Sequence, residues 1–142
     1  MQETAIRERS ALIKRGLIAL FALTLSANGV YMLAAPLAWY GDIAGVPNTG
    51  PFNPHFVRDI GVAYLTQGLL LFWAARRLAL ATPFLIAVAT FLGLHALLHL
   101  WDVAAERLPM DHLIIDLPGV FLPVFVALGL AYWCRGERAG VS

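Results

Sequence analysis

The chain has 142 residues, of which 60% are hydrophobic and only 13% are charged, and its net charge is +1. Soluble domains usually carry about 25% charged residues, so this composition excludes an ordinary soluble domain and predicts a membrane protein with the lipid bilayer as its main partner. The single cysteine, Cys134, excludes an intrachain disulfide and a cysteine-based zinc motif. The ten Lys and Arg residues are scattered and form no basic face, which excludes nucleic acid as a partner.

Four apolar stretches, each close to the ~20 residues that cross a bilayer, follow one another along the chain. They predict an all-α fold, an integral membrane four-helix bundle. The chain divides into an N-terminal segment over 1–15, a single four-span transmembrane bundle over 16–134 and a tail over 135–142. At this length one small bundle fits and a second domain does not.

The first span is expected over Gly16–Trp39, ending in Pro36 and interfacial aromatic residues. This apolar run exceeds the ~15 residues of a signal-peptide core, so we expect an uncleaved span. A loop rich in Gly, Pro and Asn follows over Gly41–Asn53. Asn53-Pro54 then has the form of an N-cap and first helical residue, and the second span runs to about Ala75.

Thr82-Pro83 is a similar start signal for the third span, which ends near Trp101. A polar connection over Asp102–Asp111 leads to the fourth span, about Leu113 to Trp133. Pro118-Gly119 and Pro123 interrupt this span. They predict kinks, or a helix that begins at Asp116 as its N-cap.

The distribution of Lys and Arg predicts the orientation. Four lie in the N-terminal segment, two in the connection between spans two and three, and two in the tail, whereas only Arg58 and Arg107 lie on the other side. The positive-inside rule therefore places both termini in the cytoplasm, and we expect a multi-pass protein of a bacterial inner membrane. All four histidines and most of the acids fall at the opposite, periplasmic face.

Histidines and acids on this face come in three short groups. Within each group, spacings of three or four residues place both side chains on one face of a helix. If the helices meet in one bundle, four imidazoles and three carboxylates converge near the outer interface, where polar groups are costly unless they are partnered. The members are His55 and Asp59 in span two, His95, His99 and Asp102 in span three, and His112 and Asp116 in span four.

Imidazole and carboxylate are ligands for Zn, Cu or Fe, and a nearby acid commonly orients a ligating histidine. We therefore expect these seven residues to form a transition-metal site that faces the periplasm. If the protein is an enzyme, it is a metal-dependent hydrolase or oxidoreductase acting on a lipid or small amphiphile, with a bound water or oxygen activated by the metal and a spare carboxylate as general base. The loop 41–53 could then serve as a lid.

Three alternatives fit the same pattern. The polar residues could form a metal-free hydrogen-bond network that holds the helices together. The protein could be a b-type haem or quinone electron-transfer protein, with two histidines such as His55 and His95 as haem ligands. It could also be a homo-oligomer or a non-catalytic subunit of a larger membrane complex, since a 142-residue bundle buries few faces of its own.

Overall fold

The computed structural model describes residues 2–140, and every regular element in that range is a helix. Two short helices and three turns connect the long ones, and a fourth turn follows the last long helix. The α-helices are α1 (Gln2–Ala34), α2 (Pro36–Asp42), α3 (Pro54–Arg76), α4 (Ala81–Ala104), α5 (His112–Ile115) and α6 (Leu122–Cys134). 3-10 turns lie at Val46–Thr49, Leu78–Leu80 and Arg135–Gly140, and a π-helical turn lies at Leu117–Phe121.

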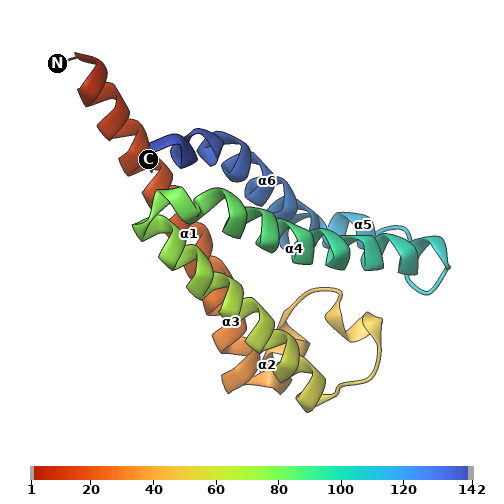
Figure 1. Cartoon of the computed structure of the whole chain (residues 1–142). Coiled ribbons are helices and arrows are strands. Elements are labelled where there is room, and N and C mark those ends of the chain that lie inside the picture. The colour runs from red at the N-terminus through yellow and green to blue at the C-terminus, as the bar shows by residue number, and fades with distance from the viewer. Residues whose placement is uncertain (1, 141–142) are drawn as a thin grey trace.

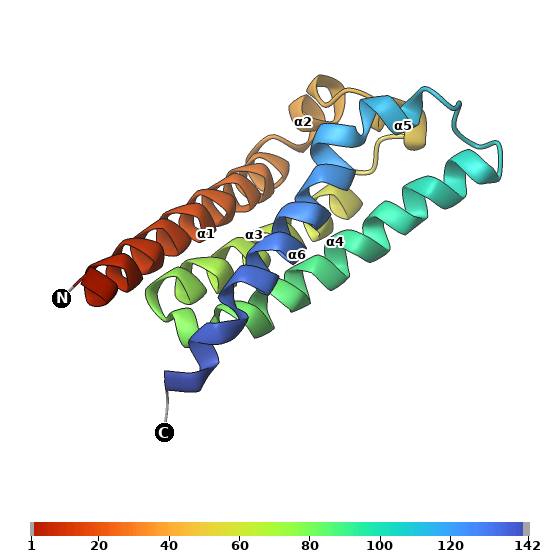
Figure 2. The ribbon, with the colours of Figure 1, turned by 90° about the horizontal axis from the view of Figure 1, so that it is seen from above.

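The four long helices are arranged as two pairs. α1 packs along α3, and α4 packs along α6, whereas the two pairs touch each other much less. Figures 1 and 2 show both pairs antiparallel, meeting near the N-terminal end of α4 and diverging toward the other end. The segment that connects α2 to α3 lies at the diverging end.

Close backbone approach holds α1 against α3. A Cβ atom added at Gly29 would lie 2.7 Å from the Gly61 carbonyl oxygen, and one added at Gly68 would lie 2.1 Å from the Ser26 hydroxyl and 2.8 Å from the Ala22 carbonyl oxygen. Small residues at such positions let membrane helices pack through their backbones, where lipid provides no hydrophobic driving force. The polar residue Ser26 thus serves α1–α3 packing through its small size.

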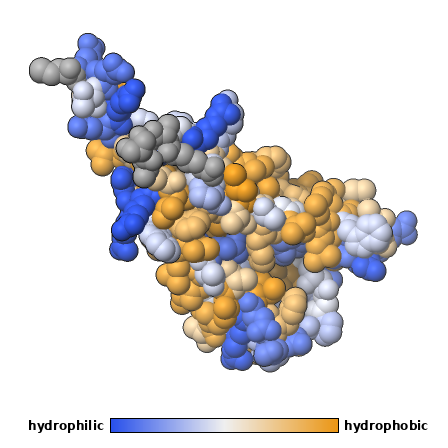
Figure 3. Space-filling model, viewed as in Figure 1, coloured by the Kyte–Doolittle hydropathy of each residue, from blue (hydrophilic) through white to orange (hydrophobic). Residues whose placement is uncertain are grey.

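Among the described residues, three helical segments are long and apolar enough to cross a membrane: Gln2–Ala34, Leu78–Ala104 and Leu117–Glu137. Many of their large side chains are exposed, as expected for surfaces that face lipid. Figure 3 shows the same division, with hydrophobic surface over the helices and hydrophilic surface at their ends. The protein is therefore a multi-pass membrane protein.

α3, the expected second span, is not among these three segments. It has 23 residues, about 35 Å of helix, so its length suffices. Its composition is less apolar because it carries Arg58, Asp59, Gln67 and Arg76. α3 packs along α1 over much of its length, so α1 covers one of its sides.

The first helix differs from its expected boundaries at both ends. It begins at Gln2, so the N-terminal segment continues the helix. It stops at Ala34, and the expected continuation to Trp39 is wrong because Ala35 leaves the helical conformation before Pro36. A proline disfavours the helical conformation in the residue before it, and here a separate short helix, α2, begins at that proline. The Trp39 indole donates to the Asn28 side-chain oxygen at 2.9 Å and holds α2 against α1.

The two predicted helix starts behave differently. The Asn53 side-chain oxygen accepts hydrogen bonds from the backbone N–H groups of His55 and Phe56, both at 3.1 Å, which confirms Asn53 as the N-cap of α3. α4 instead begins at Ala81, without a side-chain cap. Thr82 is buried, and its hydroxyl has no hydrogen-bond partner.

Polar contacts tie the two ends of the chain together. Lys14 Nζ donates to Glu137 Oε1 at 2.5 Å, joining α1 to the C-terminal turn. Arg15 donates to the carbonyl oxygens of Ala75 and Arg76 at 2.7 and 2.6 Å, so it caps the C-terminus of α3. The start of α1 and the end of α6 therefore lie at the same end of the molecule (Figure 1).

The fourth span is interrupted as its prolines predict. α5 ends at Ile115, and a π-helical turn that contains Pro118 and Gly119 leads into α6. Asp116 precedes this turn but makes no side-chain cap, so the expected N-cap role is wrong. Its carboxylate instead lies beside the imidazoles of His99 and His112.

Candidate functional site

The centre of the site is a hydrogen bond between His99 of α4 and Asp116, the residue between α5 and the π-helical turn. His99 Nδ1 lies 2.7 Å from Asp116 Oδ2, and both side chains are largely buried. Because an ionised carboxylate can only accept, His99 carries its proton on Nδ1. The Nε2 atom of neutral His99 is therefore a hydrogen-bond acceptor.

A second imidazole faces the same carboxylate oxygen. His112 is fully buried, and its Nδ1 lies 3.5 Å from Asp116 Oδ2 without making a hydrogen bond. Its Nε2 lies 3.2 Å from the Asn48 amide nitrogen. With the amide as donor to Nε2, the proton of His112 also sits on Nδ1, close to the Asp116 carboxylate.

The connection between α2 and α3 closes over this histidine. Gly45 has a φ of 85°, and a Cβ atom there would lie 2.9 Å from His112 Cε1 and 3.1 Å from Ile115 Cγ2. A glycine is needed at this position for its left-handed conformation and for the close approach to the imidazole. Gly45 and Asn48 thus join the first helix pair to the second at the end where the pairs diverge.

Aromatic rings extend the site along α4. The rings of His95 and His99 meet edge to face with their centroids 4.7 Å apart. On its other side His95 is nearly parallel to the Phe91 ring, with centroids 6.3 Å apart, and Phe91 meets Tyr64 of α3 at 5.8 Å. The result is a continuous row of contacts from α3 to Asp116.

Four of the seven predicted ligands are therefore brought together: His95, His99, His112 and Asp116. The others make contacts elsewhere. His55 Nε2 lies 3.3 Å from Asp59 Oδ2 in an exposed pair on the first turns of α3. Asp102, in the last turn of α4, accepts a hydrogen bond at 3.2 Å from Arg107 in the connection that follows.

The arrangement is a His–Asp–His unit in which His99 is hydrogen-bonded to Asp116 and His112 lies close to the same carboxylate oxygen. Within residues 2–140, no group of three or more His, Cys, Asp or Glu side chains is placed to hold a metal ion. The reason is visible in the geometry: the Asp116 carboxylate is hydrogen-bonded to His99, and His112 Nε2 accepts from Asn48. One imidazole nitrogen with a defined acceptor role, His99 Nε2, remains beside His95.

Residues 13–115 match the family described as "Domain of unknown function (DUF4345)". The chain belongs to this family. The matched region contains all four histidines and ends one residue before Asp116. No curated protein and no solved structure matches the chain.

Sequence reasoning did not identify Asn48, Gly45 or Phe91 as parts of the site. Asn48 and Gly45 lie in the segment that was expected to be a loop, and Pro and Gly around them indicate a turn without indicating what it covers. Phe91 is four residues before His95, so helical spacing alone could have placed it beside that imidazole.

Proposed function

We propose that this membrane protein binds an amphiphile with an acidic hydroxyl head group, of the phenol or quinol class, and that His99 accepts the hydroxyl proton. The observation that carries the proposal is the buried His99–Asp116 hydrogen bond. It fixes the His99 tautomer and leaves Nε2 ready to accept a proton. A buried carboxylate beside an imidazole stabilises the imidazolium that forms, which favours the transfer.

The surroundings of His99 support a ligand that arrives from the bilayer. His95 and His99 are only partly buried, and Leu94 and Leu98 on the same turns are more than half exposed. Ionisable residues in membrane segments usually have partners and mark functional sites. The Phe91–His95 stack offers an aromatic surface beside the His99 ring, which suits an aromatic head group.

The test uses 2-nitro-4-octylphenol, whose phenolate absorbs at longer wavelength and more strongly in the visible than the neutral phenol. Added to the detergent-purified full chain, the probe is expected to show a saturable increase in phenolate absorbance at about one equivalent. His99→Gln is expected to abolish the increase, and Asp116→Asn to reduce it. His55→Gln alters an exposed histidine outside the site and is expected to behave as the wild type. Equal phenolate fractions for wild type and His99→Gln would refute the proposal.

A second candidate is a transition-metal site, Zn, Cu or Fe, held by His95 and His99. One observation favours it: the Asp116 carboxylate holds Nδ1 of His99 and leaves Nε2 free. A histidine that binds a metal through one ring nitrogen usually donates the N–H of the other to a carboxylate. Two protein ligands would leave positions for water or a substrate. Elemental analysis of the purified protein separates the candidates. A stoichiometric metal that is lost in His95→Ala and His99→Ala supports the metal site, whereas wild-type protein without a stoichiometric metal refutes it.

A b-type haem has less support. The pairing of His55 with His95 or His99 would require these residues to face one slot, whereas His55 is exposed and paired with Asp59. An absorption spectrum without a Soret band would dispose of this alternative.

We also propose that the protein crosses a bacterial inner membrane four times with both termini in the cytoplasm. Two observations support this topology: both ends of the chain lie at one end of the molecule, and most basic residues are at that end. Reporter fusions at the C-terminus and within the 105–111 connection test it. If a reporter that works only in the periplasm were active when fused to the C-terminus, the proposed topology would be contradicted.

A further inference from the structure

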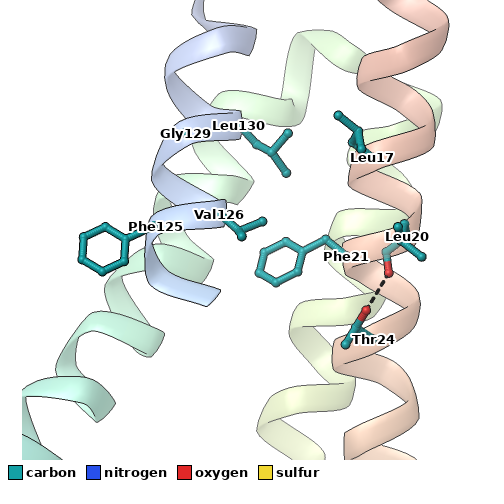
Figure 4. Close-up of a pocket in the computed structure, with 8 residues that line it drawn as sticks. All are labelled: Leu17, Leu20, Phe21, Thr24, Phe125, Val126, Gly129 and Leu130. Atoms are coloured by element: carbon teal, nitrogen blue, oxygen red, sulfur yellow. Dashed lines mark hydrogen bonds between the residues drawn. The ribbon is translucent and has the colours of Figure 1, made fainter. Parts of the chain in front are cut away.

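An apolar groove lies between α1 and α6, with a volume of about 450 Å³. Figure 4 shows Phe21 of α1 and Val126 of α6 directed toward each other across it. The one hydroxyl in its lining, that of Thr24, donates to the carbonyl oxygen of Leu20 at 2.9 Å. The groove therefore presents hydrocarbon, and its occupant must be a hydrocarbon chain.

The groove is open to the side where lipid lies. Both of its walls belong to segments that are apolar enough to cross a membrane. Leu20 and Phe125 at its edges are 61% and 68% exposed, so the chain that reaches it comes from the bilayer. An acyl chain of a phospholipid has the required shape and polarity.

One end of the groove is closed by charged residues. One turn beyond Leu17, Lys14 lies 5.5 Å from the centroid of the Trp133 ring and bonds Glu137. Next to this closure, the guanidinium of Arg135 is exposed and lies 3.6 Å from the centroid of the Tyr132 ring. Lys14 is already paired, whereas Arg135 is available to a phosphate.

Basic residues also exceed acidic ones at this end. Seven described basic residues lie here against three acids, so the local charge is positive. The basic residues are Arg7, Arg9, Lys14, Arg15, Arg76, Arg77 and Arg135, and the acids are Glu3, Glu8 and Glu137. Such an excess near the membrane surface attracts anionic head groups.

We infer that the α1–α6 groove binds one acyl chain of an anionic phospholipid, with the phosphate beside Arg135. This site is separate from the His99 site, because its lining residues and those of the His–Asp–His unit have no member in common. An acyl chain would fill the gap between α1 and α6, each of which packs closely against its own pair partner.

The test is native mass spectrometry of the detergent-purified full chain with phosphatidylglycerol or phosphatidylcholine of identical acyl chains. The first phosphatidylglycerol is expected to bind about fivefold more tightly, the effect of about one basic residue at the membrane surface. Gly129→Leu places a side chain in the groove, and its Cβ atom meets nothing within 4 Å. It is expected to weaken both lipids about tenfold, because buried methylene groups supply the affinity.

Two further variants complete the design. Gly16→Leu makes the same substitution on the exposed side of α1, where a Cβ atom also meets nothing, and is expected to bind both lipids as the wild type does. Arg135→Gln is expected to remove the preference for phosphatidylglycerol and to weaken phosphatidylcholine binding less, because the guanidinium attracts an anionic head group more strongly than a zwitterionic one. The thermal stability of each variant is measured to confirm folding.

Three results would overturn the proposal. Gly129→Leu could bind phosphatidylglycerol as tightly as Gly16→Leu does, or the wild type could bind both lipids equally. Alternatively, the wild type could be a dimer that Gly129→Leu converts to a monomer, in which case the groove holds a second copy of the chain. The lipid-binding results do not depend on whether His99→Gln loses phenol binding, so the two proposals can fail independently.

Discussion

The close contact between α1 and α3 gives a sharp prediction for Gly68→Ala. The new methyl carbon would lie 2.1 Å from the Ser26 hydroxyl, 2.8 Å from the Ala22 carbonyl oxygen and 2.9 Å from the Ser26 backbone nitrogen. The hydroxyl can rotate away, but the two backbone atoms cannot move unless α1 itself shifts.

The magnitude follows from two opposing effects. Overpacking of this kind destabilises by about 1–3 kcal/mol, and alanine gains about 1 kcal/mol over glycine in a helix. The net result is a loss of roughly 0–2 kcal/mol. Gly129→Ala is the matched control, because a Cβ atom there meets nothing within 4 Å and only the helix propensity changes. It should stabilise the protein by about 0.5–1 kcal/mol.

Reversible unfolding of both variants by SDS in mixed micelles, followed by circular dichroism, measures the difference. A second variant, Ser26→Ala combined with Gly68→Ala, should recover only part of the loss, because the backbone contacts remain. If Gly68→Ala proves as stable as Gly129→Ala, then α1 and α3 do not approach each other as described, and the small-residue interface is refuted.

Three other contacts yield predictions. Asn53→Ala removes the N-cap of α3 and should destabilise the protein by about 1 kcal/mol in the same SDS titration, whereas an unchanged midpoint would show that the cap contributes nothing. Arg15→Gln should lower the midpoint, since two helix-terminal carbonyl oxygens lose a charged donor, and added salt should reduce the difference between the variant and the wild type. His112→Leu removes the partner of Asn48, so amide exchange over residues 43–50 should accelerate while the region around His99 keeps its protection; uniform exchange across both regions would contradict this.

The structure brings together four of the seven residues of the predicted site. The i,i+4 spacing correctly placed His95 beside His99, and His112 near Asp116, because helical geometry is local. It could not tell that Asp116 crosses to α4 and bonds His99, since that contact depends on where the kinked fourth span lies against the third. The spacing also placed His55 beside Asp59, but it could not tell that this pair stays apart from the other histidines or that Asp102 bonds Arg107.

The amino-acid sequence by itself determined that the protein is helical and resides in a membrane. It also determined that α3 begins after Asn53 and that prolines break the fourth span. These properties follow from composition, from local hydrogen bonding and from backbone conformation, all of which act within a few residues. Only the tertiary structure decided that two helix pairs diverge, that a carboxylate is shared by two imidazoles, and that a groove stays open between α1 and α6. Those features depend on which side chains are small enough to let helices approach, and that is a property of pairs of segments far apart in the chain.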